Sequence, residues 1–284
     1  MAYFDQKQEL IKVFEDTEKT YSTHPVLKES IQNSIKNTEI WKEGKKISLE
    51  KTIRYEITRI SVNKFKSLET AYFYNRKFPE AKIAIHNFAS ATNPGGGVRK
   101  GSKAQEEALC RCMTLLPVLD TPENRKEFYD FHRNRHNVLY SDAVIYTPDI
   151  VAFKSDTDKP GKLLEKAWKK FDVLTCAAPN LRKNPNNYMN PGKDKPIKIS
   201  DSELKKLHVK RARHLLSVAA FHEVDILILG AFGCGAFQNP PNIVAEAYKD
   251  VLDEFYGCFQ EVAFSVYCTP RDSSNYKMFS KILG

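Results

Sequence analysis

The sequence of 284 residues lacks the features that would place it at once in a membrane, secreted or fibrous class. No stretch approaches the ~18 uninterrupted apolar residues of a membrane-spanning helix. The first ten residues, MAYFDQKQEL, lack the apolar core of a signal peptide. There is no internal repeat and no low-complexity tract, and the hydrophobic fraction of 42% is that of a globular protein. We therefore expect a cytoplasmic protein that makes no contact with a membrane.

Cysteine is present without the spacing of a disulfide framework. The six cysteines lie mostly inside apolar runs, which favours reduced, intracellular thiols. Cys110 and Cys112 are two residues apart on an expected helix and would point to different faces, and the seven histidines show no metal spacing. We expect neither a metal nor a cofactor.

The charge is unbalanced towards basic residues, with 44 Lys and Arg against 35 Asp and Glu and a net charge of +9. An excess of this size favours an anionic partner, although many basic proteins have none. A basic run from Lys193 to Arg213 is either a solvated face or a surface that attracts a polyanion such as nucleic acid.

The chain divides into two parts by pattern. Apolar residues at helical spacing, separated by His24-Pro25, predict a helical extension over residues 1–52 that packs on the rest. From residue 53 to residue 284, short apolar strands alternate with amphipathic helices. The expected strands are Ile53–Val62, Lys82–Ala89, Asp142–Thr147, Asp172–Ala177, Asp225–Leu229 and Glu261–Tyr267. The expected helices are Ala104–Leu116, Leu163–Lys170, Glu203–Phe221 and Pro241–Tyr256, the last capped by Asn239. Such alternation predicts an α/β fold whose ligands bind beyond the carboxyl ends of the strands.

The first unusual loop follows the strand Lys82–Ala89. It contains three consecutive glycines, Gly95, Gly96 and Gly97, which a compact domain seldom keeps unless the backbone needs positive φ angles or approaches a ligand closely. Seven residues later a helix opens with Gln105-Glu106-Glu107. Helical spacing puts Gln105 and Glu106 on the buried stripe and Glu107 beside it, so a carboxylate that faces a cleft is expected here.

The second unusual loop follows the strand Asp225–Leu229. It reads GAFGCGAFQNPP from Gly230 and precedes a helix, which is the general arrangement that binds phosphate through backbone N–H groups. It matches neither the Walker A nor the dinucleotide-binding pattern. A reactive thiolate at Cys234 is an alternative that we rank low.

Together these residues resemble the bacterial-type poly(ADP-ribose) glycohydrolases, a branch of the macrodomain superfamily. That family is marked by Gly-Gly-Gly, six to eight residues and Gln-Glu-Glu, as in Gly95–Gly97 and Gln105–Glu107. The resemblance spans roughly residues 80 to 245, with Phe232 where many relatives carry Trp. It implies a three-layer α/β/α macrodomain with a mixed, largely parallel sheet, which cleaves ribose–ribose bonds without a metal.

The resemblance also implies residue roles. Glu107 would be the catalytic acid, Glu106 would hold the ribose hydroxyls and Gln105 would position the site. The remaining substrate-binding residues would be Asn93, Gly95, Gly96, Gly97 and Val98 in the first loop and Gly233, Cys234, Gly235, Ala236 and Phe237 in the second. The residues that contact adenine are not marked by a motif.

The expected activity is removal of ADP-ribose from the ends of poly(ADP-ribose) by a monomer. Cleavage of a ribosyl C1–O bond needs a proton for the departing oxygen, and a protonated Glu107 can supply it. A helix N-terminus opposes protonation by about 0.3–1 kcal/mol, whereas burial and a nearby diphosphate favour it. We therefore expect the pKa of Glu107 to rise when substrate binds. The alternatives are a hydrolase that removes single ADP-ribose units from protein or nucleobase, a macrodomain that binds ADP-ribose without cleaving it, and a nucleic-acid-binding protein.

Overall fold

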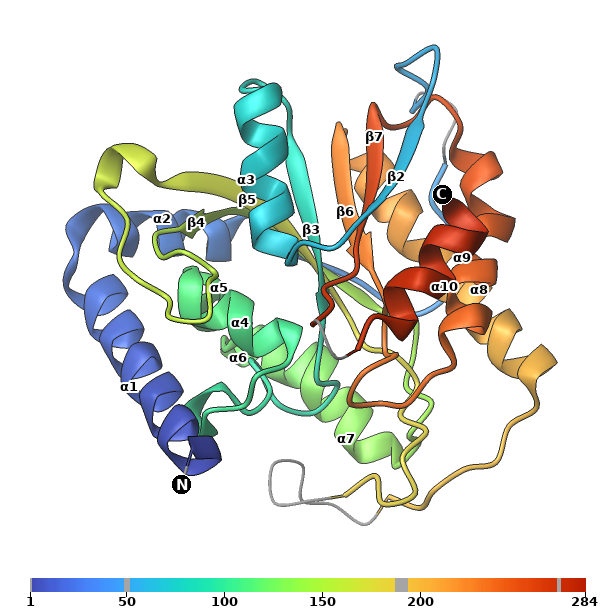
Figure 1. The fold of residues 1–284 in the computed structure, drawn as a ribbon, viewed down its shortest axis with the longest axis horizontal. Coiled ribbons are helices and arrows are strands. Elements are labelled where there is room, and N and C mark those ends of the chain that lie inside the picture. Colours follow the sequence, from blue (N-terminus) through green and yellow to red (C-terminus); the bar gives the residue numbers. More distant parts are fainter. Residues whose placement is uncertain (1, 49–51, 187–193, 270–271) are drawn as a thin grey trace.

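A seven-stranded sheet in the order β1-β4-β5-β3-β6-β7-β2 forms the centre of the molecule, with helices on both faces (Figure 1). The computed structural model describes residues 2–48, 52–186, 194–269 and 272–284. The strands are β1 (Glu39–Trp41), β2 (Arg59–Asn63), β3 (Ile83–Phe88), β4 (Val144–Ala152), β5 (Lys169–Cys176), β6 (Ile226–Gly230) and β7 (Glu261–Ser265). Five neighbouring strands, from β5 to β2, run parallel, and β4 is antiparallel to both of its neighbours, β5 and β1. The prediction of a mixed, largely parallel sheet is confirmed.

Alternating side chains of the central strands enter two separate cores, as the two-residue period of a strand requires. Ile83 and Ile85 of β3 pack with the helices on one face, whereas Ala84 between them packs with the helices on the other. The first core includes residues of α1, α3, α4 and α5, and the second includes residues of α8, α9 and α10. The three-layer arrangement follows from this double burial.

The longer helices are α1 (Ala2–Thr23), α2 (Pro25–Lys36), α3 (Ser67–Lys77), α4 (Gln105–Cys112), α8 (Asp201–Phe221), α9 (Pro241–Leu252) and α10 (Ser274–Leu283). The shorter ones are α5 (Leu115–Leu119), α6 (Pro122–Asn124), the π-helix η2 (Arg125–Asp130), α7 (Phe131–Arg135) and the 3₁₀ turns η1 (Val98–Lys100), η3 (Glu165–Ala167) and η4 (Asp253–Phe255). None of the described helices combines the length and the apolar character needed to cross a membrane.

The two N-terminal helices separate at Pro25, as the sequence predicts. Phe14 of α1 lies in the same core as α4 and α5. Thr17 donates a hydrogen bond of 2.6 Å to the carbonyl of Arg111, and both residues are buried. The division of the chain at residues 52 and 53 stays a prediction.

Two predicted helices are wrong in extent or kind. The predicted helix over Leu163–Lys170 is a 3₁₀ turn followed by the start of β5, because Lys169 pairs with Ala152 of β4. The predicted helix over Ala104–Leu116 breaks at Met113, which bridges to Ala152 and adopts an extended backbone. In both places pairing with β4 overrides helical spacing.

The strand predicted over Ile53–Val62 begins only at Arg59, and Ile53 itself is 73% exposed. Strand β1 and helices α3, α6, α7 and α10 were not predicted. The hydrophobic patterns of these segments are weak, so their structure depends on the elements that they pack against. Strand β1, for example, consists of three residues that pair with β4.

Candidate active site

A cavity of about 950 Å³ opens at the carboxyl ends of the parallel strands, where the sequence places its two unusual loops. Residues 89–104, called the glycine loop from here on, connect β3 to α4, and residues 231–240 connect β6 to α9. Both loops line the cavity, together with Ser265, Val266 and Tyr267 at the end of β7. The cavity therefore lies at the position that the two loops predict for the site.

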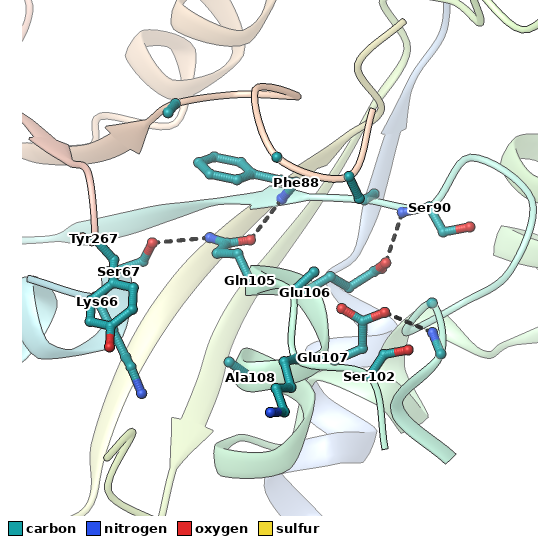
Figure 2. A pocket seen from close by; sticks show the side chains of 18 of the residues that line it. Lys66, Ser67, Phe88, Ser90, Ser102, Gln105, Glu106, Glu107, Ala108 and Tyr267 are labelled. Carbon is teal, nitrogen blue, oxygen red and sulfur yellow. Dashed lines mark hydrogen bonds between the residues drawn. The ribbon is translucent and has the colours of Figure 1, made fainter. Parts of the chain in front are cut away.

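Glu106 and Glu107 lie in the first turn of α4 and in the cavity wall, at 2% and 7% exposure (Figure 2). Glu106 accepts hydrogen bonds from the backbone N–H of Ser90 at 2.7 Å and from the Asn87 amide at 3.4 Å. Burial, and after it the neighbouring Glu107 carboxylate, raises the pKa of Glu106 well above its ordinary value. Both carboxyl oxygens of Glu106 are therefore bound to the strand end and the loop that follows it.

Glu107 is held by one oxygen only. Its Oε1 accepts a hydrogen bond of 2.8 Å from the N–H of Gly97, while its buried Oε2 has no partner among the described residues. Burial raises the pKa of the Glu107 carboxyl, against the lowering effects of the Gly97 N–H and of the Arg111 guanidinium. Burial thus outweighs the backbone hydrogen bonds and the Arg111 charge, and protonation is favoured relative to an ordinary glutamate.

Gln105, at the start of the same helix, points to β3 (Figure 2). Its amide nitrogen donates to the carbonyl of His86 at 2.8 Å and to Ser67 at 3.1 Å, and its oxygen accepts the N–H of Phe88 at 2.9 Å. The side chain therefore fastens α4 to the end of β3. Glu107, which helical spacing put beside the buried stripe, is in fact more buried than Gln105.

Glycines are required in this loop because its backbone passes close to side chains of α4 and α5. Gly95 and Gly96 have φ angles of +68° and +56°. A Cβ on Gly96 would lie 2.6 Å from Oε1 of Glu107 and 3.0 Å from Oε2 of Glu106. Only a residue without a side chain lets the backbone pass this close to the carboxyl pair.

The second loop is built around Gly233 and Asn239. Gly233 has a φ angle of +76°, and a Cβ there would lie 2.5 Å from Cβ of Ala178. The Asn239 amide donates to the carbonyls of Pro179 at 2.7 Å and Gly233 at 3.1 Å, and its oxygen lies 2.9 Å from Nε2 of His208. The prediction that Asn239 caps α9 is wrong, because the cap position is Pro240 and Asn239 instead holds the loop closed.

Most of the predicted substrate-binding residues line the cavity. They are Asn93, Gly96, Gly97, Gln105, Gly233, Gly235, Ala236 and Phe237. Gly95, Val98 and Cys234 lie behind the wall instead: Val98 is buried in the core below α4, and Cys234 packs against the core that includes α8 and α9. Burial raises the pKa of the Cys234 thiol to about 12, which opposes a role as a thiolate nucleophile.

Comparison with known proteins decides the family. Residues 8–155 match the family model described as the catalytic domain of microbial-type PARG, that is, poly(ADP-ribose) glycohydrolase. The chain belongs to this family. A search of curated protein sequences found no match.

Solved structures of the family agree with this assignment over nearly the whole chain. The poly(ADP-ribose) glycohydrolase of Thermomonospora curvata is 27% identical with a TM-score of 0.81, covering 97% of this chain and 100% of its own. Its complex with the inhibitor ADP-HPD is 28% identical with a TM-score of 0.79, over 96% and 99% of the two chains. The Deinococcus radiodurans enzyme in complex with ADP-ribose is 30% identical with a TM-score of 0.72, over 88% and 96%. The resemblance drawn from the sequence, the fold class and the class of enzyme are thereby confirmed.

Several cavity residues of this microbial-type PARG were missed by the sequence motifs. Tyr140 has a φ angle of +54°, its ring lies 6.2 Å from that of Phe237, and the Arg182 guanidinium lies over the same Phe237 ring at 5.5 Å. Lys66 and Tyr267 line another part of the wall. A motif search could have considered Tyr140, which opens a stretch similar to the family; the others come from segments without a marker.

Ion pairs neutralise part of the basic run in the described part of the chain. Lys205 pairs with Glu246 and Asp250, Lys210 with Glu43 and Asp142, and Arg213 with Glu254. Arg211 is buried at 3% exposure, and Lys193 lies outside the described residues. These ion pairs weaken the nucleic-acid-binding alternative. Among the residues that the structure describes, no group of three or more His, Cys, Asp or Glu side chains is arranged to hold a metal ion.

Proposed function

We propose that this chain releases ADP-ribose from the ends of poly(ADP-ribose) by hydrolysing ribose–ribose O-glycosidic bonds, with Glu107 as the acid and then the base. Membership of the microbial-type PARG family supports the reaction. The observation that carries the residue assignment is the state of Glu107: a buried carboxyl in the cavity wall, anchored through one oxygen and without a partner on the other.

The first step breaks the bond between C1 of the terminal ribose and the oxygen of the next unit. Protonated Glu107 gives its proton to that departing oxygen, so the shortened polymer leaves with a free hydroxyl group. The ribosyl carbon becomes oxocarbenium-like, and the substrate's own diphosphate offsets part of the positive charge. The raised pKa of Glu107 favours the protonated form that this step needs.

The second step adds water to the same carbon. The Glu107 carboxylate takes a proton from water, the oxygen bonds to C1, and ADP-ribose forms while Glu107 regains its proton. Water and one glycosidic bond are consumed, and no electron transfer or metal is involved in this scheme.

The other roles follow from the walls of the cavity. Glu106 holds the ribose hydroxyl groups, and Gln105 positions α4 against β3 through its three hydrogen bonds. The backbones of the glycine loop and of residues 233–237 lie against the diphosphate, and Phe237 supports the terminal ribose. Gly95, Val98 and Cys234 contribute through the shape of these loops, because their side-chain positions lie behind the wall.

Release of ADP-ribose from purified poly(ADP-ribose) and from mono-ADP-ribosylated protein tests the proposal, for wild type and for Glu107→Gln. We expect release from the polymer by wild type and a loss of about 10²- to 10⁴-fold in the variant, the usual contribution of a general acid. Glu123→Gln is the matched control, since Glu123 is exposed and outside the cavity.

The outcomes separate the alternatives. Release from the single-unit substrate alone keeps the site and assigns a mono-ADP-ribosyl hydrolase. Tight ADP-ribose binding without release from either substrate assigns a binding module and contradicts the catalytic role of Glu107. Oligomers among the first products, instead of ADP-ribose alone, contradict action from the chain end. Light scattering of the same preparation tests the proposed monomer.

A further inference from the structure

Helix α1 lies against the outer side of the glycine loop (Figure 1). No sequence motif indicates a part for this helix in the site. The Arg99 guanidinium pairs with Glu18 at 2.5 Å and lies over the Phe14 ring at 5.5 Å. Nearer the start of the helix, Lys103 donates a hydrogen bond to Gln6. Polar side chains therefore join α1 to the loop at two places, Gln6 near the start of the helix and Glu18 near its end.

Between these two contacts the backbones of loop and helix nearly touch. Gly101 has a φ angle of +70°, and a Cβ there would lie 2.5 Å from the carbonyl oxygen of Lys7. A glycine is required here because the helix α1 occupies the space of a side chain.

The contacts of α1 fall on one face of the helix. Its residues that meet the loop or α4 are Gln6, Lys7, Phe14, Thr17 and Glu18. Phe14 follows Lys7 by seven positions, and Thr17 and Glu18 follow Phe14 by three and four, the spacings that place residues on one side of a helix. Gln6 and Leu10 of the same helix also line the cavity. The helix is thus both a wall of the cavity and a support for the loop.

The core fixes the position of α1 independently of the loop. Lys154, a lysine at 2% exposure, donates a hydrogen bond of 2.8 Å to the carbonyl of Val13 and pairs with Asp16 at 2.8 Å. Thr17 is joined to the carbonyl of Arg111, one helical turn after Glu107. The helix is therefore a fixed surface against which the loop rests.

A short hydrogen-bonded turn of the loop connects the contact with α1 to Glu107. The carbonyl of Gly97 accepts the N–H groups of Lys100 at 2.9 Å and Ser102 at 3.2 Å, which closes residues 97–102 into one turn. Arg99 and Gly101 lie on the α1 side of that turn, and Gly97 donates its N–H to Glu107 at the other side. A shift of the turn relative to α1 moves the Gly97 N–H that donates to Oε1 of Glu107.

We propose that α1 is a positioning element of the catalytic site, in which Glu18 and the Lys7 backbone, acting through Arg99 and Gly101, keep the N–H of Gly97 on Glu107. The inference rests on the proposed role of Glu107 as the acid. None of the α1 residues touches the reacting atoms in this scheme, so they are positioning residues.

A charge swap tests the Arg99–Glu18 contact. We expect Arg99→Glu and Glu18→Arg each to lower kcat by roughly two- to fivefold, the scale of an exposed ion pair, and the double swap to restore it. Loss of the Gly97 hydrogen bond removes a contact that lowers the pKa of Glu107, so the alkaline limb of the kcat–pH profile moves to higher pH in the single variants and returns in the double swap. Arg213→Glu is the matched control, because Arg213 and Glu254 form an ion pair of similar exposure remote from the loop.

A second pair of variants tests the backbone contact. Gly101→Ala and Gly44→Ala impose the same conformational strain, since their φ angles are +70° and +71°, but Gly44 has no atom within 4 Å of the added Cβ. We expect Gly101→Ala to lose at least about tenfold in kcat, because displacement of catalytic groups by an ångström has large effects. Gly44→Ala keeps the wild-type rate and pH profile.

Three results overturn the proposal: unchanged kcat and pH profile in Arg99→Glu, no recovery in the double swap, or equal losses in Gly101→Ala and Gly44→Ala. If wild type releases no ADP-ribose, the proposed function fails instead. The positioning inference is then read from the NMR shift of the Gly97 amide proton, which we expect to move in both single swaps and to return in the double swap. An amide that stays in place in the single swaps contradicts it.

Discussion

The backbone N–H of Gly97 donates a 2.8 Å hydrogen bond to Oε1 of Glu107, whose Oε2 is buried without a partner among the described residues. Glu106, one position earlier, has both oxygens bound, to Ser90 and to Asn87. Two adjacent carboxyls therefore differ in how the protein holds them: Glu107 has one oxygen without a protein partner, which can exchange a proton, while both oxygens of Glu106 are hydrogen-bonded to the end of β3 and the loop after it.

Binding of ADP-ribose is expected to raise the pKa of Glu107 further. Burial already raises this pKa, and a diphosphate along the glycine loop would add negative charge that disfavours the carboxylate. Carbon-13 NMR titration of labelled glutamate, with and without ADP-ribose and assigned through Glu107→Gln, measures the shift. Equal pKa values in the two states contradict the placement of the diphosphate beside Glu107.

Gly96→Ala is expected to lower kcat/KM by about 100-fold or more, since the added Cβ would lie 2.6 Å from Oε1 of Glu107 and the φ angle is +56°. Steady-state release of ADP-ribose measures the loss. Gly161→Ala is the control, because Gly161 has nothing within 4 Å of a Cβ and lies outside the cavity lining. Comparable activity of the two variants would show that the loop tolerates a side chain at Gly96.

The fold could be predicted where the sequence pattern is local. The apolar strands β3, β6 and β7 and the helices α8 and α9 are marked by runs that can be recognised without their neighbours. Thr114 shows why other boundaries could not: its hydroxyl accepts the N–H of Val151 and its own N–H binds the Val151 carbonyl, so α4 ends where it meets β4. A contact between residues 37 positions apart leaves no signal in helical spacing.

The site shows the same division. The glycines and the carboxyl pair could be predicted because close approach and acid chemistry restrict the residue types allowed. Arg182 could not, because its role depends on where a separate segment brings it, over the ring of Phe237. Helix α1 was the hardest part of the site to predict. Its sequence pattern indicates only an amphipathic helix, and its contact with the glycine loop is visible only in the folded structure.

Glu106→Gln is expected to stabilise the protein at neutral and alkaline pH. The pKa of Glu106 is raised in the folded state, so its contribution to stability is present below the unfolded pKa and is lost as pH rises through the folded pKa. Glutamine removes that loss, and each kcal/mol regained raises Tm by roughly 2–4 °C in a chain of this size. Thermal unfolding at pH 4 and pH 8 measures it: the difference between variant and wild type grows with pH. A variant less stable than wild type at pH 8 contradicts the cost assigned to the buried carboxylate.

Arg211→Met is expected to destabilise the fold and to raise KM. The buried guanidinium donates to the carbonyls of Ser141 and Ala177, both at 3.1 Å, and to that of Leu139, so it holds the backbone on both sides of Tyr140 in its strained conformation. Each buried acceptor left without a donor costs about 1–3 kcal/mol, and release of Tyr140 loosens the wall near Phe237. Arg213→Met, two residues along α8, removes only an exposed pair with Glu254 and is expected to cost at most about 1 kcal/mol with KM unchanged. Urea unfolding and the KM for poly(ADP-ribose) measure both effects, and equal losses in the two variants would mean that Arg211 carries no such support.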